Sequence, residues 1–321
     1  MKAGEQMEWG IQISRISPDE KSLYLWDRFD PATAHPANTS SFARLQERWF
    51  SSPVFLQALM KGQKVSQWLL TKVHRRANPF SVQIISACGP QVLLHHQGLA
   101  DDLFVSYLEF IRTKFRPFRI RLLNYALTRG ITETALKRSH FAQIEKFATY
   151  VNRIEDDDEI LQRFHSSHRN DTRKAMRDGC EFRPSIPLAE YVRLSALTYE
   201  RSGQHGPTAE ELSGIRSELV DQGNGLMSGV YRNGNLEAAS VVLFHGHHAY
   251  YLHGASAETK VRGATTYLHF ENMRILREAG VRFYDFGGAR TGEGADDKAR
   301  SISAFKSRFG GTLVEAYGGV Q

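Results

Sequence analysis

The sequence is poor in the features that mark secreted, membrane-spanning and metal-binding proteins. It has only two cysteines, Cys88 and Cys180, and neither has a partner at the spacing of a metal site or a redox motif. No apolar run is long enough to cross a bilayer, and the N-terminal stretch MKAGEQMEWG lacks the apolar core of a secretion signal. We therefore expect two reduced, core-type cysteines in a cytoplasmic protein without an integral membrane segment.

Several catalytic signatures are absent as well. The sequence has no G-x-S-x-G elbow, no P-loop and no dinucleotide-binding fingerprint, which argues against serine hydrolases and common nucleotide-binding enzymes. His245, His247 and His248 share one turn, but no Asp, Glu or Cys stands at a fitting spacing, so we expect no bound metal.

What the sequence does contain is enough apolar residues for two domains. It has 321 residues, of which 41% are hydrophobic, and a net charge of +6. That length predicts two domains, which we place at residues 1–153 and 154–321. The mild positive charge is compatible with a polyanionic partner or a phosphorylated substrate.

The first half predicts an α/β unit with a mostly antiparallel sheet. Residues 54–59 resemble a short helix, whereas short β-type runs begin at Trp68. Asp101 and Asp102 indicate the start of a helix that continues to about Phe115.

The second half predicts helices followed by a β meander. The meander turns near Asn233 and near Gly246, and a helix led by Gly263 and Ala264 then extends to Ala279. Both halves combine hairpins, helices and strands, so we expect an α/β (α+β) fold whose mixed, mostly antiparallel sheets are flanked by helices.

One stretch, residues 281–311, organises the rest of the chain. A strand over 281–286 ends at Asp285, a Gly-rich loop over 287–303 follows, and the chain returns with Phe305 and Lys306. Such an arrangement places the Lys306 cation at the open end of a sheet. The glycines of the loop over 287–303 would allow this loop to close over a bound donor. The alternative is a pair of ordinary turns with a solvated lysine.

A second candidate site lies at the start of the 264–279 helix. Arg262, Gly263 and Ala264 combine backbone N–H groups with a cation, and Lys260 adds charge. This pattern predicts a pocket for an anion, either the pyrophosphate of a thioester cofactor or a nucleic-acid phosphate. A plain helix start with nearby surface charges is the alternative.

Two further cationic features are candidates for ligand contacts. Arg169, Arg173 and Arg177 recur every four residues, with Lys174 adjacent, and form a stripe about 12 Å long on one helix. The alternative is a solvated helix face. Arg201, expected on the loop after the third helix of this half, is a candidate for an acceptor carboxylate or phosphate, with solvent exposure as the equal alternative.

Four segments resemble the FemABX family of peptidyl transferases, which is part of the wider GNAT acyltransferase superfamily. They are KFATYVNRIEDD at 146–157, RNDTRKAMRDG at 169–179, YLHGASA at 251–257 with 268–271, and YDFGG at 284–288 with FKSRFGG at 305–311. The last pair is fairly specific. The segments span about half of the chain, mostly in the second half, and no insertion for a coiled-coil arm is present.

The resemblance implies two tandem GNAT-like domains with a substrate cleft between them, with the last strand packing back on the first domain. It also implies transfer of an amino acid from tRNA to a primary amine of a peptidoglycan precursor, whereas other members of the superfamily use acyl-CoA. In the family pattern the Phe-Lys pair lines the reaction site, so Phe305 and Lys306 inherit that role.

Chemistry supports a role for these residues. Attack of an amine on an ester or thioester builds negative charge on the carbonyl oxygen, and the Lys306 ammonium would stabilise that charge. Asp285 is the nearest candidate for the base, although an aspartate at a strand end more often caps a turn.

Three functions remain compatible with the sequence. They are aminoacyl-tRNA-dependent transfer to an amine, acyl-CoA-dependent N-acylation, and non-catalytic RNA binding. No tightly bound cofactor is expected, and the partners would be tRNA or a CoA thioester, a small amine or peptidoglycan-precursor acceptor, and peripheral contact with a lipid-linked acceptor.

Overall fold

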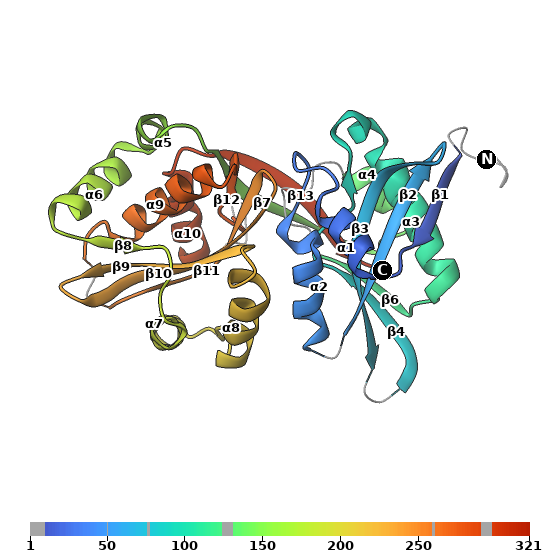
Figure 1. The fold of residues 1–321 in the computed structure, drawn as a ribbon, viewed down its shortest axis with the longest axis horizontal. Helices are drawn as coiled ribbons and strands as arrows, with labels where there is room; N and C mark the ends of the chain where they lie inside the picture. The colour runs from blue at the N-terminus through green and yellow to red at the C-terminus, as the bar shows by residue number, and fades with distance from the viewer. Residues whose placement is uncertain (1–9, 50, 76–77, 124–130, 259–260, 290–296) are drawn as a thin grey trace. The chain divides into compact units, whose positions relative to one another are not determined.

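The computed structural model describes residues 10–49, 51–75, 78–123, 131–258, 261–289 and 297–321. The chain forms two compact units (Figure 1). Unit 1 contains the residues up to Phe147 together with Glu315–Gln321, and unit 2 contains Ala148–Val314. Two strands, β7 (Gln143–Arg153) and β13 (Thr312–Val320), carry the chain from one unit into the other.

Unit 1 is a sheet with helices on both faces. Its other strands are β1 (Ile11–Arg15), β2 (Ser52–Met60), β3 (Gln63–Arg75), β4 (Asn78–Ser86), β5 (Gln91–Val92) and β6 (Arg119–Leu122). Its helices are α1 (Glu20–Asp27), α2 (Ser40–Glu47), α3 (Ala100–Phe115) and α4 (Glu133–Arg138), with short 3₁₀ turns η1 (Pro36–Asn38) and η2 (Leu94–Leu99). The strand order is β1-β2-β3-β4-β6-β13, and only the β4–β6 pair is parallel among these described strands.

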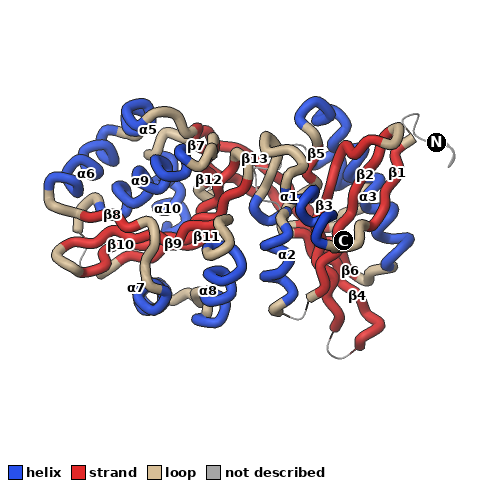
Figure 2. The backbone as a smooth tube through the Cα atoms, viewed as in Figure 1, coloured by secondary structure: helices blue, strands red, loops and turns tan. Residues whose placement is uncertain are grey.

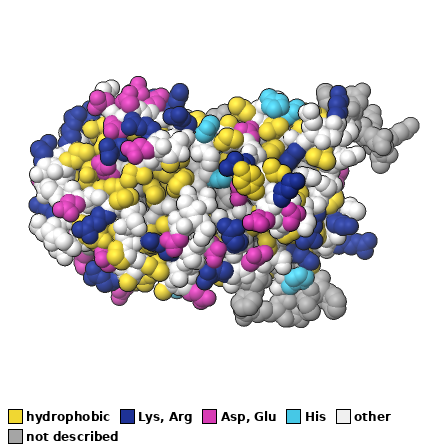
Figure 3. Space-filling view, viewed as in Figure 1, with side chains coloured by type: hydrophobic (Ala, Val, Ile, Leu, Met, Phe, Trp, Pro, Cys, Tyr) yellow, Lys and Arg dark blue, Asp and Glu magenta, His cyan; other side chains and the backbone are white. Residues whose placement is uncertain are grey.

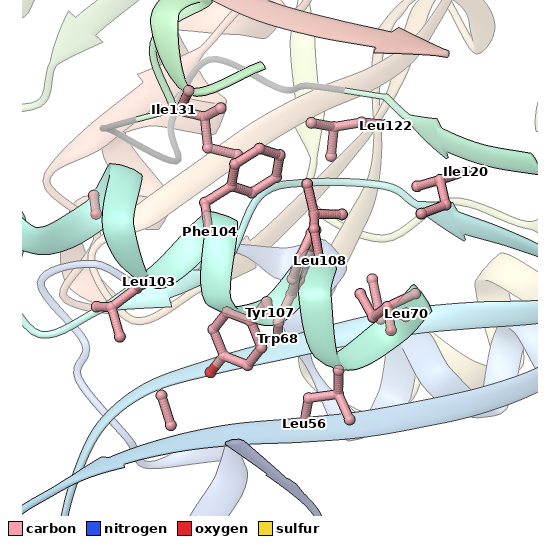
Figure 4. Close-up of a cluster of buried hydrophobic side chains, with 14 of the residues drawn as sticks. Leu56, Trp68, Leu70, Leu103, Phe104, Tyr107, Leu108, Ile120, Leu122 and Ile131 are labelled. Atoms are coloured by element: carbon pink, nitrogen blue, oxygen red, sulfur yellow. The ribbon is translucent and has the colours of Figure 1, made fainter. Parts of the chain in front are cut away.

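Strands β2 and β3 are buried on both faces. Leu56, Trp68 and Leu70 point to the side of α3 and form the main core of the unit (Figure 4). Phe55 and Leu69, one residue out of phase, pack against α1 and α2 in a smaller cluster. Because both faces of β2 are covered, its sequence is nearly continuously apolar and does not alternate between apolar and polar residues as a half-exposed strand does. The predicted helix at 54–59 is therefore wrong, and these residues lie inside β2.

Unit 2 has the same kind of architecture. Its other strands are β8 (Glu181–Arg183), β9 (Gly225–Arg232), β10 (Asn235–His245), β11 (His248–Ser256) and β12 (Phe283–Asp285). Its helices are α5 (Asp157–Arg163), α6 (Ser166–Arg177), α7 (Leu188–Ser202), α8 (Ala209–Ile215) with the π-turn η3 (Arg216–Val220), α9 (Ala264–Glu278) and α10 (Asp297–Ser307). The order is β7-β12-β11-β10-β9-β8, and β11–β12 is its parallel pair (Figure 2).

The helices of unit 2 divide between the two faces of its sheet. Helices α5, α6, α9 and α10 lie on one face, and α7 and α8 on the other (Figure 1). The parallel pair β11–β12 is joined by α9, which starts after β11 and returns the chain to β12. The predicted α/β fold with mixed, mostly antiparallel sheets is confirmed.

Two predicted loops are partly helical. Residues 297–303, expected within the loop over 287–303, form the start of α10, because Phe305 and Phe309 pack this end of the chain on the core of unit 2. Arg201, expected on a loop, lies in the last turn of α7, which continues to Ser202 and ends at Gly203 in the left-handed conformation.

No helix within the described ranges is both long and apolar enough to cross a bilayer.

Helices α6 and α9 approach each other closely at Gly263. This residue has φ +90°, and a Cβ built on it would lie 2.0 Å from the carbonyl oxygen of Asp171. Both the backbone angle and the contact with main-chain atoms therefore require glycine at the start of α9.

We predict that Gly263→Ala is more destabilising than Gly280→Ala. Gly280 has φ +85°, but no atom of the described chain lies within 4 Å of the place that a Cβ would take, so its substitution adds only backbone strain, about 1 kcal/mol. Gly263→Ala adds a clash with main-chain atoms and should cost roughly 2 kcal/mol more. Denaturant unfolding of the two variants measures the difference, and equal losses of stability would contradict the close approach.

Candidate active site

Lys306 is held by the turn that follows strand β12. It lies near the end of α10 and is half-buried. Its Nζ donates hydrogen bonds to the carbonyl oxygens of Gly287 and Gly288, the second at 2.8 Å, and lies 6.0 Å from the centroid of the Tyr251 ring. An ammonium has three N–H donors, so this arrangement fixes the group and leaves one donor for another acceptor.

The turn itself is shaped by Asp285 and two glycines. Asp285 Oδ1 accepts hydrogen bonds from the backbone N–H of Gly287 at 2.7 Å and from the hydroxyl of Thr149. Gly287 and Gly288 have φ +60° and +30°, which turns their carbonyls toward Lys306. A Cβ on Gly287 would also lie 2.9 Å from the carbonyl oxygen of Tyr251. Asp285 thus caps the turn, while its role as a base stays a prediction.

Asp285 and Lys306 carry opposite charges in a poorly solvated environment. Burial raises the pKa of Asp285 to about 6, an effect that the hydrogen bonds from Thr149 and Gly287 and the charge of Lys306 oppose. Burial lowers the pKa of Lys306 to about 8, and the Asp285 carboxylate opposes that shift. Near pH 7 both groups are therefore mostly ionised, and each favours the charged form of the other.

Aromatic rings surround this pair of charges. The ring of His269 lies 5.1 Å from Phe309, 5.0 Å from Phe286 and 4.7 Å from Tyr251. His269 Nδ1 shares a hydrogen bond of 3.0 Å with the hydroxyl of Tyr284. Burial, with smaller contributions from the charges of Lys306 and His168, lowers the pKa of His269 to about 3, so it is neutral beside Lys306.

Phe305 connects this cluster to a cavity of about 440 Å³. Its carbonyl oxygen lies 3.1 Å from His168 Nε2, and the two rings are 4.9 Å apart. Both side chains line the cavity. The described residues of the lining are His168, Asp171, Glu237, Ser256, Ala257, Val261, Arg262, Gly263, Ala264, Thr265, Thr266, Phe305 and Arg308.

The predicted anion pocket is part of this cavity. Arg262, Gly263 and Ala264 line it, and α9 starts there without a side-chain cap from the described residues. Arg262 is also paired with Asp171, with 2.7 Å between Nε and Oδ1, so part of its charge is balanced. The structure therefore brings these three residues together with Phe305, whereas Lys260 lies outside the described residues.

The other predicted cations stand apart from the described lining of the cavity. On α6, Arg169 donates to the carbonyl oxygens of Gln162 and Phe164, and Lys174 pairs with Asp178 at 2.8 Å. Arg173 is exposed to solvent. On the face of unit 2 that Figure 3 presents, basic and acidic side chains are interspersed.

Arg201 lies behind one wall of the cavity. Its Nη2 donates to the carbonyl oxygen of Ser256 at 2.5 Å, and the hydroxyl of Thr198 donates to the same oxygen at 3.1 Å. Because Ser256 lines the cavity, Arg201 supports the wall, and its side chain remains largely exposed.

Several residues of the site were not singled out from the sequence. Tyr251 and Phe309 lie within segments that resemble FemABX, so a position in the site could have been expected for them. Thr149 also lies within such a segment, at 146–157. No sequence pattern indicated His168 or Glu237, because their positions in the lining depend on contacts between elements far apart in the sequence. Within the described ranges, no group of three His, Cys, Asp or Glu side chains could hold a metal ion.

Comparison with known protein families identifies the class to which this chain belongs. The sequence model described as "Acetyltransferase (GNAT) domain" matches residues 138–306, more than half of the chain. The chain therefore belongs to the GNAT acetyltransferase family.

The resemblance to the FemABX branch is also confirmed. Lipid II:glycine glycyltransferase of Staphylococcus epidermidis is 31% identical over 105 residues, which are 32% of this chain and 24% of that protein. The corresponding protein of Staphylococcus haemolyticus is 33% identical over 87 residues, 27% of this chain and 21% of that protein. The chain thus matches less than a quarter of the length of these curated relatives.

Solved structures support the fold. The crystal structure of FemX matches with a TM-score of 0.76 at 16% identity, covering 96% of each chain. The C-terminal domain of a putative lysylphosphatidylglycerol synthetase from Agrobacterium fabrum matches with a TM-score of 0.55 at 16% identity, covering 94% of this chain and 91% of that chain. At these identities the similarity shows the shared fold alone.

We predict that Asp285→Asn lowers the pKa of Lys306. The substitution removes the anion that favours the ammonium but keeps a side-chain acceptor for Gly287, so the pKa of about 8 should fall by roughly one unit. An NMR titration of the Lys306 Cε resonance measures it. Asp178→Asn, which removes a surface carboxylate paired with Lys174, is the matched control. An unchanged or higher pKa in Asp285→Asn would contradict the electrostatic pairing.

Proposed function

We propose that this protein is an aminoacyltransferase that forms an amide between an aminoacyl group, delivered as an ester on tRNA, and a primary amine of a peptidoglycan precursor. The single observation that carries the proposal is the Lys306 ammonium, which the carbonyl oxygens of Gly287 and Gly288 fix in place. Phe305, the preceding residue of α10, lines the cavity. Membership of the GNAT family and the similarity to lipid II:glycine glycyltransferases support it.

The reaction requires stabilisation of one developing charge. The acceptor nitrogen attacks the ester carbonyl carbon, and the C–N bond forms while the carbonyl oxygen becomes an oxyanion. The C–O bond to the tRNA 3′ oxygen then breaks, and that oxygen leaves with the proton that the amine gives up. The third N–H of Lys306 is the donor assigned to the oxyanion.

Lys306 is suited to this role because it is positioned before substrate arrives. Its other two donors are engaged by Gly287 and Gly288, so little reorganisation is needed when the oxyanion forms. The surrounding aromatic rings lower the local dielectric constant, which strengthens the interaction with the developing charge. In this proposal Asp285 is a positioning residue, because its bonds to Gly287 and Thr149 hold the turn and its charge keeps Lys306 protonated.

A second candidate donor is acyl-CoA. The uncapped start of α9 lines the cavity together with Arg262, and a helix N-terminus of this kind suits a pyrophosphate. Treatment of the donor with RNase separates the two functions, because only transfer from aminoacyl-tRNA is abolished. RNA binding that ignores aminoacylation, without transfer to any amine, would instead support a non-catalytic RNA-binding protein.

We predict that Lys306→Met lowers kcat about a hundred- to thousandfold, as removal of an oxyanion donor does in other enzymes. In the wild-type protein, activity should fall as pH rises through about 8, because Lys306 loses its proton there. Initial rates of amide formation, corrected for uncatalysed ester hydrolysis, measure both effects.

Lys306→Arg is the matched control for this experiment. It keeps a cation whose pKa lies far above the range tested, so its residual activity should lack the alkaline decline. A folded Lys306→Met variant with full turnover, or an alkaline decline that persists in Lys306→Arg, would refute the assignment of Lys306.

A further inference from the structure

Unit 1 contains a strongly basic region where helix α3 connects to strand β6. Residues 112–121 contain five cations and no Asp or Glu, and the cations are Arg112, Lys114, Arg116, Arg119 and Arg121. Residues 61–100, which include the neighbouring strands β3 and β4, contain no Asp or Glu either. The positive charge of the chain is therefore unevenly distributed, and this region produces a local positive potential.

Four of the five cations face solvent. Arg112 is half-buried, and its Nε and Nη2 donate hydrogen bonds to the side-chain oxygen of Gln321 at 3.2 Å and 2.9 Å, so it ties α3 to the end of the chain. The other four side chains are exposed and form no ion pair with any residue that the structure describes. We call these four residues the basic surface, and they are Lys114, Arg116, Arg119 and Arg121.

The backbone fixes the connection that carries the basic surface. Arg116 is the C-cap of α3 in the left-handed conformation, with φ +46°, and its N–H donates to the carbonyl oxygen of Arg112 at 3.1 Å. The N–H of Phe118 donates to the carbonyl oxygen of Val82 at 2.9 Å, which joins the connection to β4. Main-chain hydrogen bonds therefore hold the connection both to the helix and to the sheet.

Strand β6 presents two arginines on one face of the sheet, beside β4 (Figure 1). Ile120 and Leu122 are buried in the main core of the unit. Arg119 and Arg121 alternate with them, so they point to the opposite face, where they are exposed and about 7 Å apart along the strand. The residue of β4 that is paired with Arg119 is Gln83, which is uncharged.

Local stabilisation of the fold explains only part of this pattern. Lys114 lies in the last turn of α3, where a cation is favoured by the partial negative charge of the helix end. No such effect acts on Arg119 and Arg121, because they lie in a strand. Like charges at this separation repel each other, and no acid of the described chain is paired with either arginine to offset the repulsion. An anionic partner with several charges would offset it.

The composition of the region favours a nucleic acid over a membrane. Three of the four cations are arginines, whose planar guanidinium matches the oxygens of a phosphate. Phe118 is 43% exposed, and within residues 112–122 no other large hydrophobic side chain is as exposed. A single apolar side chain inserts little area into a bilayer, whereas an aromatic ring among cations suits the stacking of a base beside its phosphate.

We propose that the basic surface of unit 1 binds the phosphate backbone of RNA, with Arg119 and Arg121 contacting separate phosphates. Contacts of this kind position an RNA and do not read its base sequence. They also do not require an aminoacyl group. The identity of the RNA as the tRNA of the donor rests on the proposed function, whereas the binding of phosphates does not.

Fluorescence anisotropy with a labelled, non-aminoacylated tRNA transcript tests the inference without turnover. The double variant Arg119→Gln/Arg121→Gln removes two charges and keeps polar side chains. At about 0.1 M salt it should bind about tenfold more weakly, and the slope of log affinity against log salt concentration should become shallower by about two. Lys114→Gln/Arg116→Gln should reduce the affinity and the slope in the same direction, so the test does not depend on the folding of one variant.

Lys137→Gln/Arg138→Gln is the matched control. It removes two cations from α4 of the same unit, but these cations are paired with Glu133 and Asp102, at 2.5 Å and 2.9 Å. The control should keep the wild-type affinity and slope, because its cations are already balanced within the protein.

Three outcomes with RNA would overturn the inference. They are failure of the wild-type protein to bind the transcript at about 50 mM salt, an unchanged slope in both double variants of the basic surface, and an equal loss in the control. Sedimentation with vesicles of phosphatidylglycerol and phosphatidylcholine tests the membrane. If the double variants lose vesicle binding but keep RNA binding, the surface contacts a membrane and the inference is wrong.

These measurements separate the inference from the proposed function. If the double variants bind RNA more weakly but no aminoacyl-tRNA supports amide formation, the proposed function fails and the RNA-binding surface stands. If amide formation occurs and the KM for aminoacyl-tRNA is unchanged in both double variants, only the role of the basic surface is refuted.

Discussion

The site depends on one interaction, the hydrogen bonding of a lysine ammonium to the carbonyl oxygens of a glycine turn. Lys306 could not remain charged in a half-buried position without these acceptors and the nearby Asp285 carboxylate. Hydrogen bonds of Asp285 with Gly287 and Thr149 stabilise this turn, and Asp285 and Thr149 lie on the neighbouring strands β12 and β7. Strands β7 and β12, the turn and helix α10 therefore form one electrostatic unit.

The aromatic cluster gives this unit its environment. His269, Phe286, Phe305 and Phe309 pack against one another and add no charge near Lys306, because His269 is neutral. A cationic histidine at this place would repel Lys306. The hydrogen bond between His269 and Tyr284 satisfies a ring nitrogen that would otherwise be buried without a partner.

The sequence predicted the local chemistry better than the contacts that assemble it. The strand, the glycine break and the Phe-Lys pair could be read because each depends on neighbouring residues, and the start of α9 was predicted by Gly263 and Ala264. Strand β2 was predicted to be a helix because both of its faces are buried, so its sequence lacks the apolar–polar alternation that marks a strand. Glu237 and His168 were missed because their positions in the lining of the cavity depend on contacts between elements far apart in the sequence.

The crossing of the chain between the units has a consequence for biosynthesis. Residues 315–321 belong to unit 1, and β13 pairs there with β6 through Gly319 and Val320, while Gln321 accepts hydrogen bonds from Arg112. All of unit 2 is translated before this segment leaves the ribosome. The sheet of unit 1 is therefore completed only after unit 2 has been synthesised. Until then the edge of β6 that pairs with β13 is exposed, and an exposed strand edge is a site for aggregation and for chaperone binding.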